Sequence, residues 1–334
     1  MSALPMTPTG CAVTIAEALG GAVLAKRWHA DGTATPYGNA FLYNLHPWPV
    51  ANLAGLFHVL REMLALPRHC ILRGEPVTGA TMEKVRRLLH PDPETGDRAT
   101  LRETSRRWVA VDLDSVPLPE GTDPRDLAAC ARAVRRYLPH AFRDAAAIVQ
   151  ATASHGIKPG ARLRWWAWLS RPVTGAELEN WFRGCPVDFA TFRTVQPHYT
   201  SAPLFAPGAS DPLPERLALV PGARDVVPVP PAAMLRPVRF AWPAQPRRAS
   251  NGDGAGRFAA LVRTVRESAE GERHYRLFWA ACRAGEMVAA GAIGAERAAA
   301  ELARAAMEGG GRDVKNAEAT ARDGIKRGMA GGAA

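Results

Sequence analysis

The sequence predicts an α+β (or α/β) domain followed by a small all-α helical bundle. Up to about residue 205, short apolar runs rich in β-forming residues alternate with segments whose apolar residues recur at helical spacing. After residue 255 the chain becomes rich in Ala, Arg and Glu, is nearly free of proline and keeps a helical period. A proline-rich stretch separates these parts, so we expect domains at 1–205 and 255–334, with a linker over 206–254 that could include trailing strands.

The first hundred residues contain two kinds of pattern. β-Forming runs flanked by turn signals predict strands, and apolar residues three or four positions apart predict helices. The clearest helix is Val50–Leu66, where leucine and phenylalanine side chains share one face and Pro67 ends the run. The expected elements are, in order, a short helix at Thr14–Leu19, strands at Gly21–Trp28 and Tyr37–Leu45, the helix at Val50–Leu66, a strand at His69–Leu72, a helix at Thr81–Leu89 and a polar loop over His90–Thr100.

The central strand of the domain is expected to end in two acidic residues. An apolar run begins at Trp108, and Asp112 and Asp114 follow it one residue apart, which places both side chains on one face of a strand. Two carboxylates on one face repel each other and lose hydration, so they call for a metal ion or arginine partners. The alternative is a strand that ends at Leu113, with Asp114 opening the next loop.

The rest of the domain alternates between helices and strands. In the strand Ala161–Leu169, one face would carry Arg162, Arg164, Trp166 and Trp168, and the other Leu163, Trp165, Ala167 and Leu169. The two tryptophans on the arginine face are more often packing residues than base-stacking platforms. The other expected elements are a helix from the Asp123-Pro124 cap to Phe142, a strand at Ala145–Ala151, a turn at Gly156–Gly160, a helix from Thr174 through Phe182, a return toward the sheet at Pro186–Val195 and about four helices after residue 255.

Composition favours polyanionic partners. The 334 residues carry a net charge of +10, mostly through arginine, which favours binding to nucleic acid or nucleotides. The five cysteines are scattered without a CxxC pair, so neither a zinc ribbon nor a disulfide framework is indicated. The sequence contains no GxxxxGK[ST] stretch and thus no motor of the P-loop type. Without a leader or a long apolar segment, we expect a cytoplasmic protein that does not enter the membrane.

Three further features lie downstream of the acidic strand. His155 stands in a glycine turn after a strand, Arg162 and Arg164 follow on the next strand, and Asp188 comes after an apolar residue. Taken singly, such a histidine is usually structural and such an aspartate is usually a cap. Together and in this order, Val109–Asp114, Ala153-Ser154-His155 and Val187-Asp188 resemble the three motifs of the archaeo-eukaryotic primase superfamily: an apolar strand ending in DxD, a small-x-His turn and an apolar-Asp pair.

The surrounding sequence is similar to the primase-polymerases of phages, plasmids and integrative elements. The segments that carry this similarity are Arg162–Val173, Phe192–Thr200 and a C-terminal run from Gly271 to Gly328. The last resembles the helical domain that follows many such catalytic domains. It departs at His274, where an asparagine is usual, and at Asp323, where a small hydroxyl residue is usual.

The resemblance implies a specific chemistry. Asp112, Asp114 and Asp188 would bind Mg²⁺ or Mn²⁺, and His155, Lys158, Arg162 and Arg164 would bind the incoming nucleotide, with His155 counted among the catalytic residues. The implied activity is DNA-templated synthesis of primers by two-metal nucleotidyl transfer, in the replication of a mobile element or phage. Its partners would be a single-stranded DNA template, nucleoside triphosphates and, where unwinding is needed, a helicase on a separate chain.

Two other functions fit the same residues. One is a two-metal nuclease or phosphohydrolase that uses the same three aspartates. The other is a non-catalytic nucleic-acid-binding replication protein, to which the net positive charge would also be suited.

Overall fold

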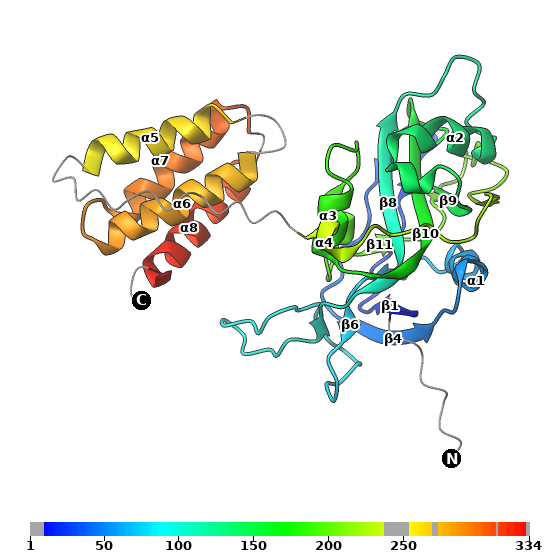
Figure 1. The fold of residues 1–334 in the computed structure, drawn as a ribbon, viewed down its shortest axis with the longest axis horizontal. Coiled ribbons are helices and arrows are strands. Elements are labelled where there is room, and N and C mark those ends of the chain that lie inside the picture. Colours follow the sequence, from blue (N-terminus) through cyan, green and yellow to red (C-terminus); the bar gives the residue numbers. More distant parts are fainter. Residues whose placement is uncertain (1–9, 237–253, 269–272, 312, 332–334) are drawn as a thin grey trace. The chain divides into compact units, whose positions relative to one another are not determined.

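The computed structural model describes residues 10–236, 254–268, 273–311 and 313–331, which belong to two compact units, Met1–Phe240 and Ala241–Ala334 (Figure 1). The first unit extends past the expected boundary at residue 205. Strand β13 (Leu217–Val220) pairs with β9 (Ala147–Ala151), and the short helix α4 (Ala232–Leu235) follows it. Prolines are tolerated here because the strand is short, lies at a sheet edge and is flanked by irregular chain. The remainder of the expected linker, 237–253, lies outside the described residues.

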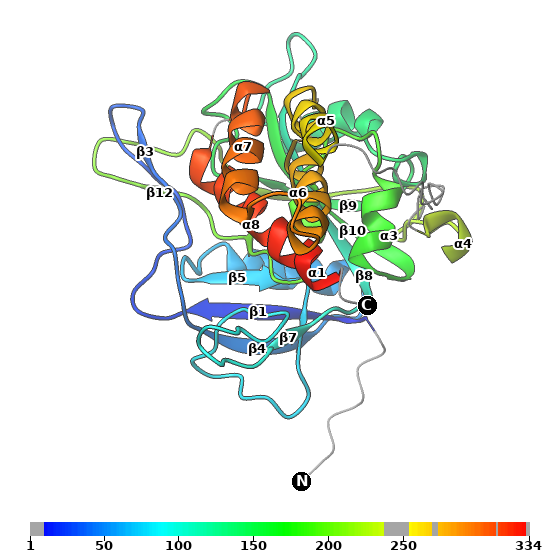
Figure 2. The same cartoon turned by 90° about the vertical axis from the view of Figure 1, so that its left-hand side faces the viewer.

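Two four-stranded sheets form the body of the first unit. The first has the order β11-β5-β1-β4, with β1 between β4 and β5 (Figure 2), and the second has the order β13-β9-β10-β8. Every strand pair in both sheets is antiparallel, so the unit is α+β. The bounds of the remaining strands of the two sheets are β1 Ala12–Ala18, β4 Tyr43–Pro49, β5 His69–Leu72, β8 Arg106–Val116, β10 Ala161–Val173 and β11 His198–Tyr199.

Two smaller sheets and three helices complete the unit. One small sheet has the order β12-β2-β3, and the other pairs β6 with β7. Their strands are β2 Arg27–Trp28, β3 Ala34–Thr35, β12 Leu204–Phe205, β6 Glu75–Pro76 and β7 Leu101–Arg102. The helices are α1 Leu53–Met63, α2 Leu127–Val134 and α3 Gly175–Trp181, and a 3₁₀ turn, η3, covers Phe189–Phe192.

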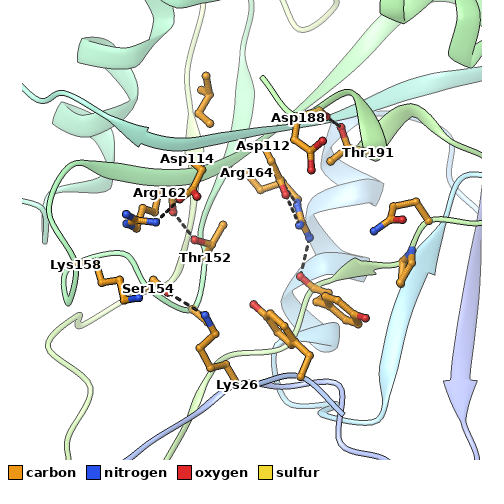
Figure 3. A pocket seen from close by; sticks show the side chains of 16 residues that line it. Lys26, Asp112, Asp114, Thr152, Ser154, Lys158, Arg162, Arg164, Asp188 and Thr191 are labelled. Atoms are coloured by element: carbon orange, nitrogen blue, oxygen red, sulfur yellow. Dashed lines mark hydrogen bonds and ion pairs between the residues drawn. The ribbon is translucent and has the colours of Figure 1, made fainter. Parts of the chain in front are cut away.

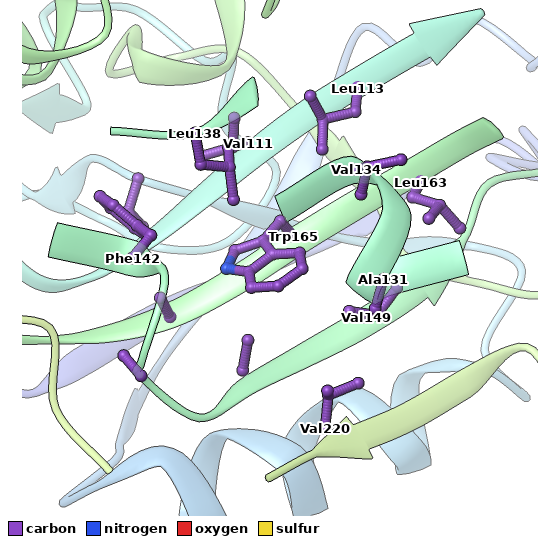
Figure 4. Close-up of a cluster of buried hydrophobic side chains, with 14 of the residues drawn as sticks. Val111, Leu113, Ala131, Val134, Leu138, Phe142, Val149, Leu163, Trp165 and Val220 are labelled. Carbon is purple, nitrogen blue, oxygen red and sulfur yellow. The ribbon is translucent and has the colours of Figure 1, made fainter. Parts of the chain in front are cut away.

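The second sheet is buried on both faces. On one face Trp165 of β10 packs among Val111 of β8 and Val134 of α2 (Figure 4), and Leu178 of α3 belongs to the same cluster. On the other face Trp108, Trp166 and Trp168 pack against α1 and the first sheet. The expected alternation along Ala161–Leu169 is confirmed, and the two tryptophans of the arginine face are core residues.

Three expected helices differ in the structure. Residues 14–18 belong to β1, because β4 and β5 both pair with this segment. Residues 81–89 are irregular, because Val85 forms a β-bridge with Tyr43 and Lys84 adopts a positive φ of 53°. The helix expected from Asp123 to Phe142 is shorter: Asp126 caps α2, and two 3₁₀ turns, Arg135–Tyr137 and His140–Phe142, follow it.

The predicted helices at 50–66 and 174–182 are confirmed as α1 and α3, and the strand at His69–Leu72 is confirmed as β5. Thr174 forms a capping box with Glu177, which satisfies two backbone donors at the start of α3.

The described part of the second unit contains four helices: α5 Gly254–Arg266, α6 Arg273–Ala289, α7 Ala295–Glu308 and α8 Val314–Gly331. Their core consists of alanines with a few larger residues such as Leu277, Leu302 and Ile325. Helices α6 and α8 approach closely, since a Cβ on Gly328 would lie 1.9 Å from the Cys282 carbonyl oxygen. Over the residues described, none of the helices is long and apolar enough to span a membrane.

The glycine contacts predict opposite effects for two helical Gly→Ala substitutions. Gly328→Ala should destabilise the helical unit by more than about 1 kcal/mol, because the backbone of α6 must move away. Gly55→Ala in α1 should stabilise the first unit by about 0.5–1 kcal/mol, since its Cβ would meet Asn52 Oδ1 at an ordinary 3.5 Å. Chemical denaturation monitored by circular dichroism measures both changes. Stabilisation by Gly328→Ala would contradict the close packing of α6 and α8.

Candidate functional site

The shared face of β8 and β10 changes from apolar to charged along the strands. Trp168 lies opposite Trp108 and Trp166 opposite Ala110, and the next cross-strand pair on this face is Arg164 opposite Asp112. Beyond a register shift, Arg162 also reaches across to Asp114. The period of two therefore places both ion pairs at one end of the two strands.

A pocket of about 480 Å³ lies at this end of the sheet (Figure 3). Asp188 joins it because its backbone N–H donates to the Asp112 carbonyl oxygen at 3.3 Å, which holds η3 beside β8. The structure thus brings together the three predicted carboxylates and three of the predicted cations. The charged residues that line the pocket are Asp112, Asp114, Asp188, Lys26, Lys158, Arg162 and Arg164.

Asp112 and Arg164 form a two-point ion pair within the pocket wall. Arg164 Nε lies 2.5 Å from Asp112 Oδ1, and Nη2 lies 2.8 Å from Oδ2. The third nitrogen of the guanidinium, Nη1, donates to the Tyr199 carbonyl oxygen at 2.7 Å. Burial on its own would raise the pKa of Asp112, but the charge and hydrogen bonds of Arg164 hold that pKa below its usual range. Arg164 is only 8% exposed and therefore positions Asp112.

Asp114 and Asp188 are more accessible. Asp114 pairs with Arg162 at 2.5 Å, yet 70% of its side chain is exposed. Asp188 is exposed, and its Oδ1 accepts the Ala190 backbone N–H at 2.9 Å, so that it caps η3. One oxygen of each carboxylate is engaged by these partners, and the second has no hydrogen bond among the described residues.

The carboxylates fit divalent ions by their chemistry. Mg²⁺ and Mn²⁺ prefer hard oxygen donors, and Asp112, Asp114 and Asp188 supply them from one pocket. In the present arrangement the two strand carboxylates are held by arginines, and over the described residues no three His, Cys, Asp or Glu side chains are grouped closely enough to hold a metal. Asp114 and Asp188 each keep an oxygen that could accept an ion directly, whereas both oxygens of Asp112 are already bonded to Arg164.

His155 lies behind the pocket wall and not in the pocket. It is fully buried, its Nε2 lies 2.9 Å from the Pro124 carbonyl oxygen, and its Nδ1 accepts the Arg162 backbone N–H at 3.3 Å. Both ring nitrogens are thus occupied, which corresponds to a neutral ring that donates from Nε2. Burial lowers the pKa of His155 and favours that neutral form. His155 does not line the pocket in which we expected it to meet a triphosphate, and its ring instead bonds the backbone of Arg162.

Several pocket residues were not anticipated from the sequence. Lys26 and Tyr37 come from the N-terminal segment around β2, which β12 joins by parallel pairing. The rings of Tyr37 and Tyr199 stack with centroids 4.3 Å apart. Neither Lys26 nor Tyr37 follows an acidic or glycine-rich motif. The sequence therefore offered only one weak indication, the position of Lys26 between the apolar Leu24-Ala25 and Trp28.

Comparison of this chain with protein-family models, curated proteins and solved structures yields no match. The function must therefore be inferred from the pocket itself.

The two arginines should differ in their effect on stability. Arg164→Met should lower the free energy of unfolding by about 3 kcal/mol, because it leaves Asp112 without its buried partner and breaks the bond to Tyr199. Arg162→Met removes the same charge but should cost less than about 1 kcal/mol, because Asp114 is largely exposed. Urea unfolding of the two variants compares them directly. Equal losses would mean that the Asp112 pair has no special structural role.

Acid should destabilise the fold through two buried histidines. His198 packs between Trp108 and Trp166, and burial lowers its pKa from 6.5 to about 3. Burial also lowers the pKa of His155. Below pH 6.5 the unfolded chain takes up these protons and the folded chain does not, so stability falls by up to about 1.4 kcal/mol per pH unit for each histidine.

Thermal unfolding between pH 7 and pH 4.5 measures this loss. His198→Leu should flatten the dependence, whereas His58→Gln, at an exposed position on α1, should leave it unchanged. If the stability of His198→Leu falls as steeply with decreasing pH as that of the wild type, His198 does not cause the acid sensitivity.

Proposed function

We propose that this protein is a DNA primase or primase-polymerase that joins nucleotides on a DNA template by two-metal nucleotidyl transfer. The observation that carries the proposal is the pocket in which three carboxylates from β8 and η3 meet four cationic side chains. Hard oxygen ligands beside phosphate-binding groups are what transfer of a nucleotide to a 3′-hydroxyl requires. The resemblance of the three sequence motifs to the primase superfamily supports the same reaction.

The acidic residues would supply the metal ligands. Asp112, Asp114 and Asp188 would hold two Mg²⁺ or Mn²⁺ ions, which when bound activate the attacking hydroxyl and stabilise charge on the triphosphate. Arg164 keeps Asp112 ionised and fixes its orientation from β10. The neutral His155 ring holds the start of β10, and with it Arg162, at the pocket edge.

The cationic residues would bind the nucleotide. Lys158 is exposed and Arg162 is partly exposed, whereas all three nitrogens of Arg164 are already bonded. Arg162 can exchange Asp114 for a phosphate oxygen once the carboxylate binds a metal, because its planar group forms paired hydrogen bonds with either. The net charge of +10 supports a single-stranded DNA template as the second substrate.

Nuclease or phosphohydrolase activity by the same aspartates is the competing function, and a non-catalytic DNA-binding protein is another. Full-length protein incubated with single-stranded DNA, labelled nucleotides and Mg²⁺ or Mn²⁺ separates them. The proposal expects new labelled oligonucleotides. Shortening of an end-labelled strand would indicate a nuclease, and DNA binding with no reaction would indicate a binding protein.

Replacement of a carboxylate should abolish synthesis without loss of the fold. Asp188→Asn keeps the cap on η3 but removes the charge, so the rate should fall about a hundredfold or more. Asp123→Asn is the matched control, because Asp123 is exposed, lies outside the pocket and accepts the Arg125 backbone N–H at 2.8 Å in the same i to i+2 pattern. Synthesis and melting temperature are measured for both. Near wild-type synthesis by Asp188→Asn would exclude Asp188 from the site.

A further inference from the structure

Two lysines from distant segments converge on one indole ring. Lys26 Nζ lies 5.8 Å from the centroid of the Trp28 ring, and Lys158 Nζ lies 6.0 Å from the same centroid. Lys26 Nζ also lies 5.6 Å from the centroid of the Tyr37 ring. Both lysines line the pocket, and Figure 3 shows them at the same end of it. Aromatic faces attract ammonium groups, which localises both charges there.

These two lysines differ from the arginines of the pocket in their partners. Arg162 and Arg164 each pair with a carboxylate, but neither lysine is within ion-pair distance of one in the described part of the chain. Among the residues that the structure describes, the side chain of Lys26 donates only to the Ser154 hydroxyl oxygen, at 3.2 Å. Two like charges near each other that lack an ion-paired carboxylate oppose folding, so their placement favours an anion that binds between them.

The electrostatics of Lys26 agree with this. Its pKa is lowered, first by burial and then by the positive charges of Lys158 and Arg162, while the negative charge of Asp114 acts in the opposite direction with a smaller effect. A bound polyanion would offset all of these effects at once.

The support beneath the lysines is rigid. Trp28 is 4% exposed, and its Nε1 donates to the Ala153 carbonyl oxygen at 2.7 Å. The turn that carries Lys158 bends at Gly156, where a Cβ would lie 2.7 Å from Leu213 and φ is +76°. The segment Ala153-Ser154-His155 is thus bonded to Trp28, Lys26 and Pro124 in succession. Preorganised donors lose little entropy when a ligand binds.

We propose that Lys26 and Lys158, held over Trp28, form a polyphosphate-binding site that takes the terminal phosphates of a nucleoside triphosphate. This inference rests on the proposed function for the identity of the nucleotide, and it makes Lys26 a specificity residue for triphosphates over monophosphates. The three carboxylates would then lie near the phosphate that is attached to the sugar.

The test is equilibrium binding by isothermal titration calorimetry with the full-length protein in the presence of Mg²⁺. The probes are inorganic tripolyphosphate, dATP and dAMP. Wild-type protein should bind dATP more tightly than dAMP, and Lys26→Met and Lys158→Met should each weaken binding of dATP and tripolyphosphate about tenfold. Binding of dAMP should change less than about twofold, because its single phosphate does not reach the lysines.

Two further variants complete the experiment. Lys84→Met removes the same charge from an exposed position in the same unit, beside Asn44 of β4, and should leave dATP binding unchanged. Lys26→Arg keeps the charge and should retain most of the affinity. Lys158 is exposed in the turn that carries it, so Lys158→Met should fold and tests the site even if Lys26→Met does not fold. Equal affinity of wild type and Lys158→Met for tripolyphosphate would overturn the site, as would a loss in Lys84→Met of the same size.

The binding result is independent of synthesis. Lysine-dependent binding of tripolyphosphate by a protein that makes no oligonucleotides would retain the site and reject the proposed function. Oligonucleotide synthesis with unchanged dATP binding in Lys158→Met would retain the function and reject the site.

Discussion

The ion pair between Asp112 and Arg164 is the interaction on which the site depends. The arginine bonds Asp112 of β8 and the Tyr199 carbonyl oxygen of β11, so that one guanidinium joins the two sheets. Below it the sheets meet through Trp108, Trp166 and a neutral His198. An ion pair next to such an apolar layer is tolerated only when its hydrogen bonds are satisfied, and all three nitrogens of Arg164 are. The pocket opens where this layer ends.

The pair also determines how charge is distributed in the pocket. Four cations and three carboxylates line it, and the most buried of each are bonded to one another. The remaining acids, Asp114 and Asp188, are accessible to ions, and the remaining cations are accessible to an anion. A pocket with accessible carboxylates beside accessible cations favours a ligand that combines a metal ion with phosphates, because the ion offsets the negative charges and the phosphates offset the positive ones.

The sequence predicted those parts of the fold that depend on local periodicity. The alternation in β8 and β10 placed Asp112, Asp114, Arg162 and Arg164 on one face, and α1 and α3 followed from their apolar spacing and from a capping residue. Residues 14–19 were predicted to form a helix because alanines fit the helical and the strand period equally well. Only the pairing of this segment with β4 and β5 shows that it is a strand.

The positions of His155 and Lys26 and the extent of the first unit depend on tertiary contacts, which the sequence alone does not show. A histidine in a glycine turn has the same local sequence whether it faces a ligand or the interior, and the bonds to Pro124 and Arg162 place His155 in the interior. Lys26 was missed because it reaches the pocket through parallel pairing of β2 with β12, more than a hundred residues away along the chain. Whether residues 206–236 form a linker likewise depended on the pairing of β13 with β9.

The central claim is that Asp112, Asp114 and Asp188 hold divalent ions together with a nucleotide in one pocket. Crystals of the full-length protein grown with Mn²⁺ and a non-hydrolysable deoxynucleoside triphosphate would test it directly through the anomalous signal of manganese. We predict anomalous peaks within about 2–2.5 Å of oxygens of all three aspartates, with Arg162 turned from Asp114 to the phosphates. Nucleotide bound elsewhere, or a pocket without manganese in which both arginine pairs remain closed, would contradict the account.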